Sequence, residues 1–133
     1  MTNNIPRLLP SEGLVGRYGD LKKTESIGDN VTAHHIPSDA FMKGKRIAGY
    51  SRNKGIAINM EQPYPGSGGR HRRTRSYGQP PYLSLSPRQV LAREVWDVRS
   101  IYRRDGLYTS QMRQSLQQVI QQNKLAWPGT FDK

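Results

Sequence analysis

Three histidines and one asparagine are the residues of this 133-residue chain best suited to chemistry. His34 and His35 are adjacent at the end of a predicted strand, and His71 opens a predicted short helix. Asn59 lies between them on a second predicted strand. Hydrolysis of a phosphodiester needs a base that deprotonates water and a cation that neutralises the leaving oxygen. Histidine suits the first task by its pKa and can hold a metal ion for the second.

The two adjacent histidines are suited to different tasks. Neighbouring residues of an extended strand point to opposite faces. His34 and His35 are therefore expected to divide the work, with one facing the cation and the other facing the attacking water. Pro37 turns the backbone just afterwards, a turn that can bring both imidazoles close to the same phosphate.

Four arginines flank His71 closely, namely Arg70, Arg72, Arg73 and Arg75. Guanidinium groups bind phosphate through two parallel hydrogen bonds, so we expect this cluster to hold a nucleic-acid backbone. The whole chain carries a net charge of +11, which favours a polyanionic partner. The alternative interpretation is a solvated run of charge on a generally basic protein.

The composition excludes several kinds of site. The chain has no cysteine, so disulfides, thiol nucleophiles and cysteine-based zinc sites are ruled out. A closed structural zinc site usually needs four ligands, which three histidines do not supply. The glycine-rich stretch 66–69 lacks the Gly-Lys-Ser/Thr of a phosphate-binding loop. The apolar runs are far shorter than the roughly 20 residues that span a bilayer, and the N-terminus lacks a secretory-signal profile, so we expect no membrane association.

The spacing of apolar residues, glycines and prolines predicts one α+β domain over residues 1–133. Ser38 and Ser86 have the position and chemistry of helix caps, and Gly106 ends a long amphipathic pattern. The predicted parts are a loop-rich segment over 1–30, strands at 30–36 and 55–60, a helical turn at 38–43, a loop at 63–69, a short helix within 70–78, and two supporting helices within 86–125.

Residues 33–41, with the sequence AHHIPSDAF, are followed at plausible spacing by Asn59 and His71. This arrangement resembles the HNH or His-Me finger nucleases, including the toxin nucleases labelled AHH. The resemblance covers roughly residues 31–78. It implies a small ββα-metal core, supported here by two C-terminal helices and long loops.

The resemblance also implies a role for each residue of the motif. His34 and His71 would bind the metal ion. His35 would be the general base, and Asn59 would orient it through a hydrogen bond. Imidazole ligands suit zinc, nickel or cobalt, whereas a shell completed by water also serves magnesium or manganese.

The metal shell that the resemblance implies is incomplete in this chain. Many members of the family carry a second ligand one helical turn after the helix histidine, where this chain has Arg75. Water, phosphate oxygens, Asp39 or Glu61 are candidates to complete the shell, and the sequence does not choose among them.

These observations predict a metal-dependent endonuclease, acting on DNA rather than RNA, with little sequence preference because no base-reading motif is found. The resemblance further implies the C-terminal toxin domain of an antibacterial effector, delivered by a secretion system into the target-cell cytoplasm. Its partner would be an immunity protein, acidic to match the basic domain. The alternatives are a non-catalytic nucleic-acid-binding module, a toxin enzyme of another chemistry such as a nucleotide-modifying transferase, and histidines that are ordinary strand and surface residues.

Overall fold

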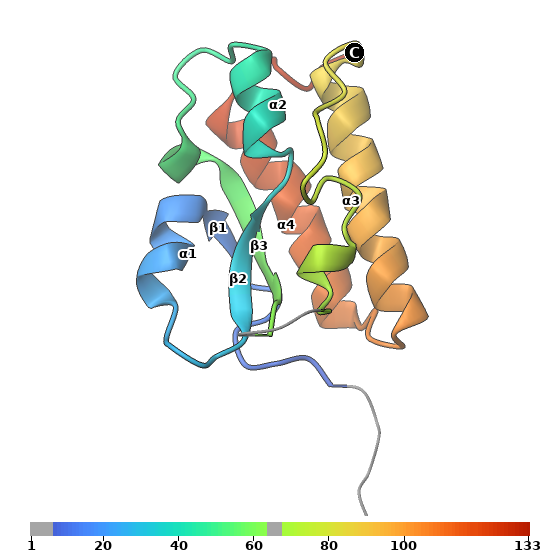
Figure 1. Cartoon of the computed structure of the whole chain (residues 1–133). Helices are drawn as coiled ribbons and strands as arrows, with labels where there is room; N and C mark the ends of the chain where they lie inside the picture. The colour runs from blue at the N-terminus through green and yellow to red at the C-terminus, as the bar shows by residue number, and fades with distance from the viewer. Residues whose placement is uncertain (1–6, 64–67) are drawn as a thin grey trace, which may run out of the picture.

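A three-stranded antiparallel sheet with helices on both faces forms the centre of the protein (Figure 1). The computed structural model describes residues 7–63 and 68–133. The strands are β1 (Val15–Arg17), β2 (Val31–His35) and β3 (Ile56–Glu61), in the order β1-β3-β2. The helices are α1 (Tyr18–Thr24), α2 (Asp39–Gly44), α3 (Pro87–Arg104) and α4 (Ser110–Ala126), with 3-10 turns η1 (Arg52–Lys54) and η2 (His71–Arg73). The predicted α+β class is confirmed.

The register of β2 against β3 decides which histidine faces which layer. His34 pairs with Ile58, and His35 pairs with Ala57. Paired residues of an antiparallel ladder project to the same face. Ile58 belongs to the main core that includes α3 and α4, whereas Ala57 packs against α1. His34 and His35 therefore face opposite layers of the protein.

Helices α3 and α4 begin at local signals that the sequence carries. Ser86 accepts a hydrogen bond from the Gln89 backbone N–H, and the Gln89 side chain accepts one from the Ser86 backbone N–H. This reciprocal pair satisfies two N–H groups at the start of α3. Thr109 caps α4 by accepting from the Met112 backbone N–H. Both predicted C-terminal helices are confirmed.

Asn123 of α4 ties the helical layer to the end of β2. Its buried side-chain amide donates to the Ile36 carbonyl at 2.8 Å and to the Val119 carbonyl at 2.8 Å. Ile36 directly follows His35, so this contact fixes the backbone beside the histidine pair. A buried carbonyl without a partner would cost about 1–3 kcal/mol.

Two predictions about local structure are wrong. The segment predicted as loop contains β1 and α1, because β1 pairs with β3 (Val15 with Ile58) and α1 buries Leu21. These contacts are long-range and leave no local periodicity. The predicted helix within 70–78 is the single turn η2, which ends where Thr74 adopts an extended conformation. Of the predicted 63–69 loop, residues 64–67 lie outside the described residues.

None of the helices within the described ranges combines the length and the apolar character that crossing a membrane requires.

Two leucines of α4 test the core directly. Leu116 is 3% exposed and Leu125 is 73% exposed. We expect Leu116→Ala to lower the free energy of unfolding by about 2–5 kcal/mol, because it leaves a cavity in the core. Leu125→Ala should change it by less than about 0.5 kcal/mol. Urea unfolding of both variants measures this difference, and similar losses in the two would contradict the described packing.

Candidate active site

Two of the three histidines lie side by side. The ring centroids of His34, on β2, and His71, on η2, are 4.9 Å apart, with the rings at 68° to one another. His34 is only 6% exposed, and the edge of the His71 ring also contacts Tyr77. Two imidazoles from segments far apart in the sequence thus form one cluster.

Both imidazoles of this pair are neutral at physiological pH. Burial, together with the neighbouring His71 and His35, lowers the pKa of His34 to about 3. Burial and the positive charges of Arg72 and Lys22 lower the pKa of His71 to about 4. A neutral imidazole has one unprotonated nitrogen, the form that binds a metal ion.

Gln62, just past the end of β3, fixes the orientation of His71. The His71 Nδ1–H donates to the side-chain carbonyl oxygen of Gln62. This bond assigns the proton to Nδ1, so Nε2 is the unprotonated nitrogen. A metal-binding histidine usually donates its second ring N–H to a carboxylate, carbonyl or water in the same way.

His35 is held in a separate environment on the α1 side of the sheet. Its ring stacks on Tyr18 with centroids 4.2 Å apart, and its Nε2 lies 2.8 Å from the Arg52 carbonyl oxygen. A carbonyl can only accept, so Nε2 carries the proton and Nδ1 is unprotonated. A Cβ at Gly55 would lie 2.6 Å from the His35 ring, so this contact leaves no room for a side chain there.

The pKa of His35 is also lowered, because burial disfavours its charged form. The hydrogen bond to Arg52 and the negative charge of Asp39 act in the opposite direction. Asp39 itself accepts a hydrogen bond from the Tyr50 hydroxyl at 2.7 Å. His35 is therefore neutral at pH 7, with a carboxylate near enough to stabilise its protonated form.

The side-chain amide of Asn59, which was expected to orient His35, has a different partner. Asn59 pairs with Ala33 in the ladder, two pairs away from the pair that His35 makes with Ala57. Its side-chain amide donates to the Ser11 carbonyl at 3.3 Å. Within the described ranges, the hydrogen-bond partner of His35 is the Arg52 carbonyl, which takes the role expected of Asn59.

The two predicted oxygen ligands lie in other interactions. Asp39 accepts from Tyr50 and pairs with Lys43 at 3.0 Å. Glu61 accepts from the Arg70 backbone N–H at 3.2 Å. Across the part of the chain that the structure describes, no group of three His, Asp or Glu side chains is arranged to hold a metal ion. His34 and His71 are the two imidazoles that the described part of the chain brings together, and water or phosphate oxygens could supply further ligands.

Arg70 is withdrawn from solvent and does not fit the predicted phosphate-binding role. Its guanidinium donates to both oxygens of the buried Glu12, at 2.7 and 2.8 Å. It also donates to Asp105 at 3.3 Å. Burial raises the pKa of Glu12, but hydrogen bonds from Arg70 and Tyr102 outweigh it, and the net shift is downward. This ion pair anchors the backbone directly before His71.

The other three arginines of the cluster differ in the hydrogen bonds and ion pairs that their side chains make. Arg73 donates to both oxygens of Asp105 at 2.9 Å. Arg72 donates to the Gly68 carbonyl at 3.1 Å. The Arg75 side chain is 79% exposed and lies 3.7 Å from Asp97. Arg72 and Arg75 are therefore the arginines best able to contact a phosphate backbone.

Several residues that contribute to the site were not predicted from the sequence. Gln62 is a polar residue at a strand end, a position where a site residue is plausible. Tyr18 and Glu12 lie in the segment predicted as loop, and the Arg52 contribution comes from a backbone carbonyl that any residue would supply. Comparison of the chain with protein-family models, curated proteins and solved structures finds no match.

The lowered pKa values predict a pH dependence of stability. In the unfolded chain histidine titrates near pH 6.5, so between about pH 4 and 6.5 the unfolded state binds more protons than the folded state. The contribution of His71 to the free energy of unfolding should therefore fall as pH falls through this window. The pKa of Glu94 is raised in the folded state, so Glu94 changes the free energy of unfolding with pH in the opposite direction. The pH dependence of the wild type alone therefore does not isolate the contribution of His71.

The informative quantity is the difference between wild type and His71→Gln. Urea unfolding in the presence of a chelator, at several pH values from 4.5 to 6.5, gives the free energy of unfolding as a function of pH. The slope of this plot should be shallower in the variant, by an amount that corresponds to uptake of up to about one proton fewer on unfolding. Equal slopes in the two proteins would show that His71 titrates normally and is not held neutral by its surroundings.

Proposed function

We propose that the chain is a metal-dependent nuclease that hydrolyses the phosphodiester backbone of nucleic acid. The observation that carries the proposal is the close pairing of two neutral imidazoles, His34 on β2 and His71 on η2. The strand β2 also presents His35. The residues divide into a pair able to hold a cation and a third imidazole with a free Nδ1. This division matches the two needs of hydrolysis, charge neutralisation and a base.

The donor set of this pair fits a divalent cation. His34 and His71 would hold the ion, and the hydrogen bond from His71 to Gln62 leaves the Nε2 of His71 available. When bound, the cation would supply Lewis-acid chemistry that neutralises charge on the phosphate and on the leaving oxygen. Zinc, nickel or cobalt suit imidazole ligands, and magnesium or manganese suit a shell filled mainly by water.

His35 is the general base in this proposal. Its Nδ1 accepts a proton from the attacking water, while the Arg52 carbonyl keeps the other nitrogen protonated. Stacking on Tyr18 holds the ring plane. The carboxylate of Asp39 stabilises the imidazolium that forms, so we reassign Asp39 from a metal ligand to an electrostatic partner of His35.

The finer fold assignment is also a proposal. β2, β3 and η2 occur in the order strand, strand and helical turn, with α2 and η1 between the two strands. This order corresponds to the ββα order of His-Me finger nucleases. The single turn of η2 stands in place of a full helix. The toxin role, the delivery by a secretion system and the acidic immunity protein rest on the resemblance, and the net charge of +11 suits both that partner and DNA.

One rival function has a specific observation in its favour. His34 and His35 face opposite layers of the protein, and the pair His34–His71 lacks a third protein ligand among the described residues. A non-catalytic module that binds nucleic acid through its basic surface would need neither a base nor a complete metal site.

Cleavage of plasmid DNA distinguishes the two functions. Purified protein should nick plasmid in the presence of a divalent metal and lose this activity with chelator. His35→Ala should lower the rate by about 10²–10⁴-fold, because the base is removed. His35→Ala purified identically also controls for a co-purifying nuclease. Cutting that survives this variant, or wild-type binding without cutting under any metal, contradicts the proposal.

The exposed arginines should control affinity rather than chemistry. In the His35→Ala background, Arg72→Ala or Arg75→Ala should weaken DNA binding and lower the slope of log affinity against log salt by about 0.9 each. Arg113→Ala, at an exposed position on α4, is the matched control and should leave the slope unchanged. An equal effect of all three variants would mean that the protein uses its net charge and not this cluster.

A further inference from the structure

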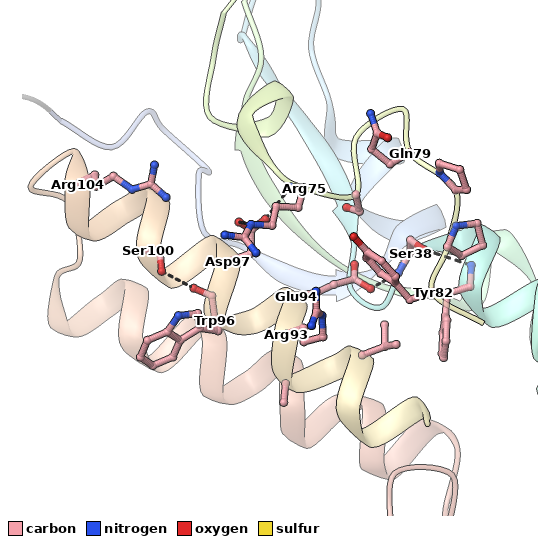
Figure 2. Close-up of a pocket in the computed structure, with 16 residues that line it drawn as sticks. Ser38, Arg75, Gln79, Tyr82, Arg93, Glu94, Trp96, Asp97, Ser100 and Arg104 are labelled. Atoms are coloured by element: carbon pink, nitrogen blue, oxygen red, sulfur yellow. Dashed lines mark hydrogen bonds and ion pairs between the residues drawn. The ribbon is translucent and has the colours of Figure 1, made fainter. Parts of the chain in front are cut away.

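A pocket of about 470 Å³ lies beside α3, and Arg75 is among the residues that line it. One face of α3, the segment 75–82 and the turn at Ser38 line it (Figure 2). Its volume is in the range of about 300–1,000 Å³ that small-molecule sites occupy. The three histidines are not among the described residues that line it.

Glu94 of α3 is the unusual residue of this pocket. One carboxyl oxygen accepts the Ser38 backbone N–H at 3.3 Å, and Figure 2 shows the two residues facing one another. The other oxygen is shielded from water and has no hydrogen-bond partner in the described part of the chain. Burial, assisted by Asp97, raises the pKa of Glu94 to about 8. A buried polar atom without a partner costs free energy that a bound donor would recover.

The mouth of the pocket carries aromatic and cationic groups. Tyr82 is 56% exposed, and the Arg93 guanidinium lies 4.9 Å from its ring centroid. Arg75 and Arg104 also line the pocket. Exposed aromatic rings stack on nucleobases, and arginines at the rim bind the attached phosphate. A buried carboxyl behind an aromatic and basic rim therefore complements a nucleotide.

We propose that this pocket binds a nucleobase that carries an exocyclic amino group, as adenine, cytosine and guanine do. When the base binds, the Glu94 carboxyl releases its proton to solvent, and the amino N–H donates to the unpartnered oxygen of the carboxylate, a pairing of the kind that Glu makes with cytosine in base recognition. Tyr82 stacks on the base, and the rim arginines hold its phosphate. Uracil and thymine present carbonyl oxygens in place of the amino group and leave Glu94 without this donor.

In this proposal, Tyr82 rotates onto the incoming base and so opens the way to the Glu94 oxygen. Tyr82 lies at the surface, and exposed side chains change rotamer within nanoseconds. Such changes commonly accompany ligand binding without movement of the backbone.

The pocket is linked to the proposed catalytic strand through Ser38. Its backbone N–H holds Glu94, and it follows His35 by only three positions in the chain. The source of the base rests on the proposed function. In a nuclease, the base would belong to the substrate strand and would give cleavage a base preference. Sequence reasoning found no base-reading motif because the pocket forms from segments distant in the chain.

Titration calorimetry with the four ribonucleoside 5′-monophosphates tests this site on the full chain. AMP, CMP and GMP should bind at least about tenfold more tightly than UMP. Glu94→Leu should abolish this preference, because it removes the acceptor, and should remain folded in a thermal melt, because it removes an unpaired buried carboxyl. Glu94→Gln should turn its amide oxygen to the Ser38 backbone N–H and its amide N–H to the base, so it should favour UMP instead. A wild type without preference, or a Glu94→Gln variant that keeps the wild-type preference, overturns the proposal.

A second arm identifies the source of the base. Short single strands that carry one cytosine in a thymine background should bind more tightly than CMP if the natural ligand is a strand, and equally if it is a free nucleotide. Either result keeps the pocket, whereas equal binding of the cytosine strand and an all-thymine strand removes it. These experiments measure binding and not cleavage. A failure of this proposal can therefore be distinguished from a failure of the nuclease proposal.

Discussion

The buried ion pair between Arg70 and Glu12 holds the candidate site in shape. It joins the turn before β1 to the turn before η2, and the Tyr102 hydroxyl brings α3 to the same carboxylate. Charges that are buried must be paired with good geometry, because an unpaired buried charge costs several kcal/mol. The position of His71 follows from this constraint, since Arg70 is its immediate neighbour. Arg70, which the sequence analysis assigned to phosphate binding, therefore stabilises the structure of the site.

The second constraint is the alternation of β2. The two adjacent histidines of β2 point to opposite faces of the sheet, and each face has a different kind of partner for its histidine. On one side His34 meets a second imidazole, and on the other His35 meets a backbone carbonyl and a tyrosine ring. Burial lowers the pKa of both, so both are neutral at pH 7, yet their free nitrogens are set up for different roles.

The sequence predicted those parts of the fold whose causes are local. Ser86, Gly106 and the spacing of apolar residues predict α3 and α4, the β-branched run predicts β2, and alternating apolar residues predict β3. β1 and α1 were missed, because only pairing with β3 and burial of Leu21 stabilise them. Within the site, the resemblance paired His34 with His71, and the two imidazoles lie together. Asn59 was expected to hold His35, whereas the partner found among the described residues is the Arg52 carbonyl, and a backbone carbonyl has no signature in a sequence.

The nitrogen-15 shifts of the three histidine rings test the central claim most directly, because each ring has a distinct expected state. In metal-free protein at pH 7, His35 should carry its proton on Nε2 and His71 on Nδ1. On addition of Zn²⁺, the unprotonated nitrogens of His34 and His71 should shift together at one equivalent of metal, while those of His35 stay unchanged. Shifts confined to one ring, or no shift in either His34 or His71, would contradict the shared cation site.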